Sequence, residues 1–163
     1  MKQNILKKIA LIALLGMGLF AQVYAASPLV GYWKSVDDRT GEALSIIEIK
    51  KLENGTYGGF IVHRFAAPGG VPLTHCTKCP EPYRNKPLIG MQILSGFIED
   101  PKKPNNFIHG KVLEAKSGKI FEGKGQLVAD GRRLRLRGFI GVSMLGRTQV
   151  WVKVNDPQAE INK

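Results

Sequence analysis

The chain has 163 residues, an apolar fraction of 44% and a formal net charge of +11. This apolar content predicts a folded core and excludes intrinsic disorder, while the length allows one domain. The positive charge is compatible with nucleic acid, an anionic membrane surface or an acidic ligand, or simply with a basic solvated surface.

Residues 1–25 have the pattern of a secretory signal peptide. Three lysines precede an apolar run at residues 9–20, and Val23 and Ala25 provide small or modest residues at the minus-three and minus-one positions of a cleavage site after Ala25. The apolar run is about a dozen residues long, whereas a membrane anchor needs ~20. We therefore expect residues 26–163 to form one soluble domain, periplasmic or secreted, with a net charge of +8 once the three signal lysines are removed. Export excludes nucleic acid as a partner.

Turn signals divide the remaining chain into short runs of strand composition. The strongest is Asn54-Gly55, whose residues tolerate the positive φ of a type I′ hairpin turn. A short helical turn is expected in residues 80–90 or after Asp156. The expected strands are 30–36, 42–51, 56–65, 90–99, 107–114, 119–129, 132–140 and 147–154.

Several of these runs alternate with a period of two. Between residues 132 and 137, two leucines point one way and three arginines the other. Between residues 147 and 154, Thr148 and three valines share one face, opposite Arg147, Gln149, Trp151 and Lys153. One buried face per strand in consecutive hairpins predicts an all-β fold, an antiparallel sandwich or barrel. Glycines inside the strands favour the strong coiling that a closed barrel of eight strands needs.

The long connection at residues 66–86 contains Cys76 and Cys79. In an oxidising compartment, the favoured interpretation is a disulfide that holds the loop. A redox-active pair and a zinc site with His63 and His75 are the alternatives.

No serine, histidine and carboxylate arrangement typical of a hydrolase is visible, so we predict no enzymatic activity, no cofactor and no metal. The arginines of 132–137 form a basic stripe. It is either a solvated outer face or a surface for lipid headgroups, polyanionic glycans or an envelope protein.

The chain resembles the lipocalins, and more closely a family of uncharacterised exported bacterial proteins. Three segments carry the resemblance: Gly31-Tyr32-Trp33, residues 84–90 (Arg-Asn-Lys-Pro-Leu-Ile-Gly), and residues 146–151 (Gly-Arg-Thr-Gln-Val-Trp). It covers roughly residues 29–154. It implies an eight-stranded antiparallel lipocalin-like (calycin) barrel and small-ligand binding. The Cys-x-x-Cys loop departs from the family pattern.

Lipocalin topology implies that the first and last strands pair. Lys153 would then lie over Trp33 at the closed end, as a structural contact beside Gly31. The opposite, open end would gather the connections 37–41, 66–86, 115–118 and 141–146.

From this placement we predict that the ligand-binding residues are Arg147, Arg84, Met144, Leu145 and His63. The ligand would be a small apolar or amphipathic, lipid-like molecule, and an anionic group on it would pair with an arginine. The alternatives are an interaction module that uses the basic face or the cysteine loop, and a thiol-redox or metal-dependent protein.

Overall fold

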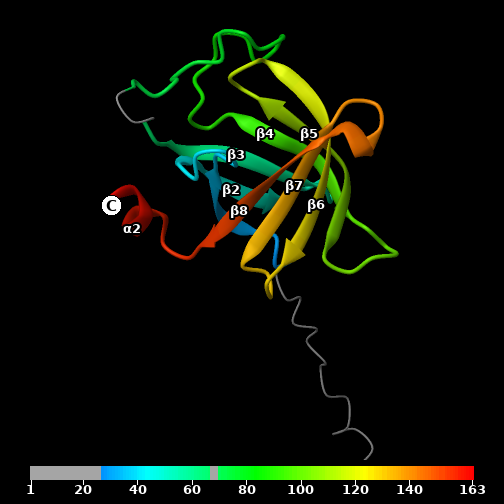
Figure 1. Cartoon of the computed structure of the whole chain (residues 1–163). Coiled ribbons are helices and arrows are strands. Elements are labelled where there is room, and N and C mark those ends of the chain that lie inside the picture. The colour runs from blue at the N-terminus through cyan, green and yellow to red at the C-terminus, as the bar shows by residue number, and fades with distance from the viewer. Residues whose placement is uncertain (1–26, 67–69) are drawn as a thin grey trace, which may run out of the picture.

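A computed structural model describes residues 27–66 and 70–163, and the predicted signal peptide lies outside this part of the chain. Eight antiparallel strands form a closed barrel in which each strand pairs with its neighbours in sequence (Figure 1). The strands are β1 (Gly31–Val36), β2 (Ala43–Lys51), β3 (Tyr57–Arg64), β4 (Gln92–Glu99), β5 (Asn106–Glu114), β6 (Lys119–Val128), β7 (Arg133–Phe139) and β8 (Arg147–Val154). The prediction of an eight-stranded antiparallel barrel is confirmed.

Pairing of β1 with β8 closes the barrel. Trp33 lies opposite Lys153, and the neighbouring pairs are Tyr32 with Val154 and Lys34 with Val152. In the described part of the chain, every strand therefore has a neighbour on both sides, and no strand stands at the edge of an open sheet.

The alternation along β7 and β8 decides which side chains enter the barrel. Leu134 and Leu136 are buried inside, and Arg133 and Arg135 are exposed outside. In β8 the face of Trp151 points inward, because Trp151 pairs with Leu134. The exposed valines of β8, at 150 and 152, therefore belong to the outer face.

The closed half of the barrel is filled by large side chains. Trp33 is fully buried, and its Nε1 donates a hydrogen bond to the Leu29 carbonyl at 2.8 Å. Tyr57 and Phe107 pack edge to face with ring centroids 5.5 Å apart. The void left in this layer measures about 10 Å³, room for about one water molecule. This half of the barrel therefore has no room for a molecule larger than about one water.

Lys153 covers the ring of Trp33 at the closed end of the barrel. Its Nζ lies 4.5 Å from the centroid of the Trp33 ring and donates hydrogen bonds to the carbonyls of Pro28 and Val30. Burial lowers the pKa of Lys153. The ammonium thus ties the residues before β1 to the last strand.

A short helix, α2 (Pro157–Ile161), follows β8 and lies beside the barrel (Figure 1). Asp156 caps it by accepting hydrogen bonds from the backbone N–H groups of Gln158 and Ala159. Glu160 binds Lys34 on the outer face of β1 at 2.6 Å, and its hydrogen bonds with Lys163 and Lys34 lower its pKa to about 2. The sequence predicts a helical turn either in residues 80–90 or after Asp156, and α2 lies at the second of these positions.

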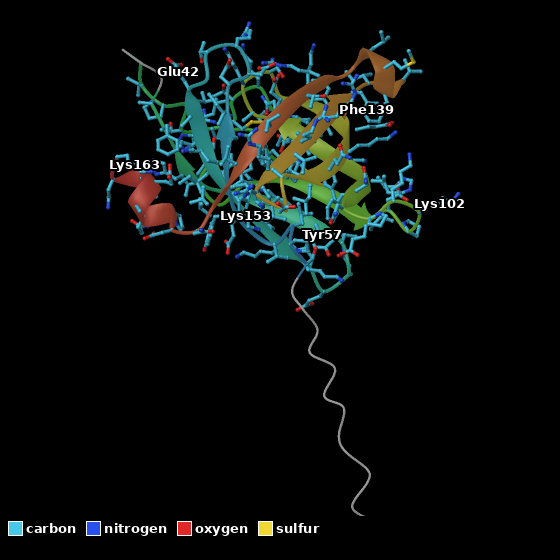
Figure 2. The ribbon with its side chains drawn as sticks, turned by 60° about the horizontal axis from the view of Figure 1, so that its bottom comes forward. Glu42, Tyr57, Lys102, Phe139, Lys153 and Lys163 are labelled. Atoms are coloured by element: carbon cyan, nitrogen blue, oxygen red, sulfur yellow. A yellow bond between two sulfur atoms is a disulfide. The ribbon has the colours of Figure 1, made fainter. Side chains whose placement is uncertain are left out.

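The open end carries the four connections that follow β1, β3, β5 and β7. Figure 2 shows Glu42 and Phe139 at this end, and Tyr57 and Lys153 at the other. A short 3-10 helix, η1 (Ser143–Leu145), lies in the last of these connections.

Candidate ligand-binding cavity

A cavity of about 280 Å³ occupies the open half of the barrel. Its polar lining comes largely from the adjacent strands β8, β1, β2 and β3, which contribute Gln149, Ser35, Ser45 and Arg64. The strands across the barrel contribute mainly apolar side chains. These are Ile93, Val112, Leu113, Phe121 and Leu136.

Trp151 and Ile61 add apolar surface to the polar side of the cavity. Asp37, Arg39, Glu114, Lys116 and Arg147 also line it, near the mouth. The cavity is therefore amphipathic, with one polar and one apolar wall.

Arg64 is the most unusual side chain in this lining. Its Nη1 donates a hydrogen bond to Ser45 Oγ at 2.9 Å, while its buried Nε has no hydrogen-bond partner among the described residues. Burial lowers the pKa of this guanidinium.

Arg64 also has no carboxylate partner. It forms no ion pair within the described part of the chain, and residues 1–26 and 67–69 contain no Asp or Glu. Buried charges in proteins are normally paired. The cavity therefore contains a half-buried cation that makes no ion pair with a described carboxylate, including Asp37 and Glu114 of the same lining.

An irregularity in strand pairing turns Arg64 inward. Ile47 pairs with Ile61, but the next residue of β2, Ile46, pairs with His63, so Val62 is an extra residue in β3. Regular alternation from Ile61 would turn His63 into the barrel and Arg64 out of it. With the extra residue, Arg64 shares the inner face with Ser45, and His63 moves to the outer face. His63 therefore does not line the cavity, and its ligand-binding role stays a prediction.

Arg147 lines the mouth of the cavity as expected from lipocalin topology, but a carboxylate already binds it. Its Nε donates to Asp38 Oδ2 at 2.9 Å, and its Nη2 donates to the other oxygen of Asp38. This pair lowers the pKa of Asp38. It also links the β1–β2 connection to the start of β8 across the rim.

The other predicted ligand-binding residues lie outside the cavity lining. Arg84 is exposed, and its Nε approaches the Cys79 carbonyl at 3.4 Å. Met144 and Leu145 are exposed on the rim connection after β7. Met144 and Leu145 lie on the rim of the open end, as lipocalin topology implies, and the ligand-binding role of all three residues stays a prediction.

Cys76 and Cys79 are both buried, with sulfur atoms at disulfide distance and Cα atoms 5.4 Å apart. They pack in the same apolar cluster as Leu88, with Ala115 of the β5–β6 connection against it.

His75 is exposed, and His63 lies on the outer face of β3. Within residues 27–66 and 70–163, no three His, Cys, Asp or Glu side chains are grouped to hold a metal ion. In the same residues, no helix is both long and apolar enough to cross a membrane.

The barrel is similar to a solved structure described as protein HP1028 from the human pathogen Helicobacter pylori, which is stated to belong to the lipocalin family. The TM-score is 0.66 at 18% sequence identity, over 82% of this chain and 87% of the other. This likeness shows a lipocalin-like fold. No curated protein matches the sequence. Residues 31–153 match the family described as "Uncharacterized protein conserved in bacteria (DUF2147)", and the chain belongs to that family.

Proposed function

We propose that this protein binds a small amphipathic anion in the open half of its barrel. The anionic group pairs with Arg64, and the apolar body packs against the β4–β7 wall. The single observation that carries the proposal is the half-buried Arg64 guanidinium, whose buried Nε has no hydrogen-bond partner and which makes no ion pair among the described residues.

The polar wall matches the needs of a carboxylate or phosphate. An arginine can present two N–H groups to one such anion, and charge-assisted hydrogen bonds of this kind are stronger than neutral ones. Gln149 stands on the same wall, where its Oε1 accepts a hydrogen bond from Trp151 Nε1 at 3.2 Å. The amide N–H₂ of Gln149 is then available to donate to the same ligand.

The volume limits the size of the ligand. A cavity of about 280 Å³ lies near the lower end of the ~300–1,000 Å³ range of small-molecule sites. At ~30 Å³ for each water-sized unit, it accommodates a body of about ten non-hydrogen atoms. A medium-chain carboxylate such as octanoate has this size and this division into head and tail.

The proposal includes export of the chain to the periplasm or the medium. The pattern of residues 1–25 supports export, and so does the cysteine pair at disulfide distance, because disulfides persist in oxidising compartments.

Native mass spectrometry tests the proposal. Protein purified without detergent should carry a bound small acid that denaturation releases, and the Arg64→Met variant should have lost it. Purified wild-type protein that is free of ligand and takes up no added medium-chain acid would contradict the proposal.

A further inference from the structure

The connection between β7 and β8 exposes four large apolar side chains to solvent. The exposed fractions are 65% for Ile140, 60% for Val142, 89% for Met144 and 83% for Leu145. We call these four residues the apolar loop. In Figure 1 the orange ribbon of this connection projects from the barrel after β7. Clustered exposed apolar residues commonly mark an interaction surface.

The apolar loop is held in place by the barrel. The guanidinium of Arg137 donates to the carbonyl of Ser143 at 2.7 Å, to the carbonyl of Met144 at 3.0 Å and to Thr148 Oγ1 at 2.9 Å. Met144 and Leu145 therefore point outward on a fixed backbone, so their insertion into an apolar phase costs little additional ordering of the chain.

The surface next to the apolar loop is basic. Residues 139–149 contain no Asp or Glu. Lys124 pairs with Arg137 across β6 and β7, and its Nζ lies 5.4 Å from the ring centroid of Phe139. The strand register also places Lys111, Arg133 and Arg135 on the outer face of β5, β6 and β7. Glu122 is the one acidic side chain on this face of the three described strands.

We propose that the apolar loop and this basic face dock the protein on an anionic lipid bilayer. The apolar side chains enter the boundary between headgroups and acyl chains, and the lysines and arginines bind the anionic headgroups. Apolar residues flanked by cations are the combination with which proteins bind such surfaces. The loop borders the mouth of the cavity, so docking places that mouth at the bilayer surface.

Vesicle flotation tests the proposal with the chain that begins at Ala26, which contains every strand of the barrel. The probes are vesicles of equal parts phosphatidylcholine and phosphatidylglycerol, and vesicles of phosphatidylcholine alone. Wild-type protein should bind the mixed vesicles and bind the neutral ones far more weakly. The Met144→Ser/Leu145→Ser variant should lose at least about tenfold in partitioning. Lys124→Gln/Arg135→Gln should lose about fivefold for each charge.

Matched variants remove equivalent groups elsewhere. Lys102→Gln/Lys103→Gln removes two charges from the β4–β5 connection at the closed end, and Ile98→Ser removes an exposed apolar side chain near the same end. Both should keep wild-type binding. Arg64→Met should also bind vesicles normally, which separates this proposal from the ligand hypothesis. Failure of wild-type protein to float with mixed vesicles would overturn the proposal. So would a dimer in sedimentation that Met144→Ser/Leu145→Ser abolishes, because the loop would then bind a second copy.

Discussion

Inside the barrel, the Arg64 guanidinium donates a hydrogen bond to Ser45 Oγ at 2.9 Å, and this hydroxyl is a neutral partner. At the rim, Arg147 is bound by the carboxylate of Asp38. One arginine of the cavity is thus paired with a carboxylate of the protein, while the other makes no ion pair with a described side chain.

The Asp38–Arg147 pair gives a first prediction. Asp38→Asn should raise the affinity for octanoate, because it frees a second guanidinium at the mouth. Arg147→Ala should weaken binding less than Arg64→Met does, since Arg147 is exposed and already paired. Isothermal titration calorimetry at neutral pH measures both effects. Weaker octanoate binding by Asp38→Asn would show that the ion pair helps to form the site.

Lys153→Met should destabilise the barrel by about 1–3 kcal/mol. It removes the cation over the Trp33 ring and leaves two backbone carbonyls without their donor. Urea unfolding followed by tryptophan fluorescence gives the free energy of unfolding. The exposed Lys102→Met variant is the control and should change it by less than about 0.5 kcal/mol. Equal stability of the two variants would remove the structural role of Lys153.

Replacement of both cysteines by serine should lower the free energy of unfolding by about 2 kcal/mol, because the disulfide closes a very short loop. The barrel should persist, since its ladder of strands is complete without residues 76–79. Hydrogen exchange should increase in the cysteine loop and in residues 115–118, which pack against it. Thiol titration of denatured wild-type protein should find no free cysteine. Two reactive thiols in freshly purified protein would contradict this account.

The contact between α2 and β1 should respond to acid. Two lysines hold the pKa of Glu160 at about 2 when folded, below its ordinary value of 4.5. A lowered carboxyl pKa stabilises the folded state above the unfolded pKa, and this contribution is lost as the pH falls through the folded pKa. The helix should therefore stay docked at pH 5 and loosen between about pH 4.5 and 2. Carboxyl NMR titration of Glu160 measures the pKa, and Glu160→Gln should show no such transition. A Glu160 pKa near 4.5 would contradict the contact.

The overall fold could be predicted because its signals are local and repeated. Turn residues separate the strands, and the two leucines of β7 mark its inner face, which the structure confirms. The pairing of β1 with β8 followed from the family resemblance, since no local pattern specifies a contact between the two ends of the chain.

The candidate binding site could be predicted only in part, because one extra residue in the β2–β3 pairing decides whether His63 or Arg64 faces the cavity. Val62 carries no sequence signal of a bulge, so regular alternation would turn His63 inward and Arg64 outward. The alternation in β8 is equally ambiguous, because both of its faces carry large apolar side chains. Trp151 enters the barrel, while Val150 and Val152 lie on the outer face. The partner of Arg147 was missed because Asp38 lies 109 residues away in sequence.

The most direct test of the central claim compares octanoate with octanol, which share a chain length and differ in charge. Both are titrated against wild-type protein and against Arg64→Met, with thermal unfolding to show that the variant is folded. We predict that wild-type protein binds octanoate at least about tenfold more tightly than octanol, and that Arg64→Met abolishes this difference. Equal affinities of wild-type protein for the two compounds, or a preference for octanoate that survives Arg64→Met, would contradict the account.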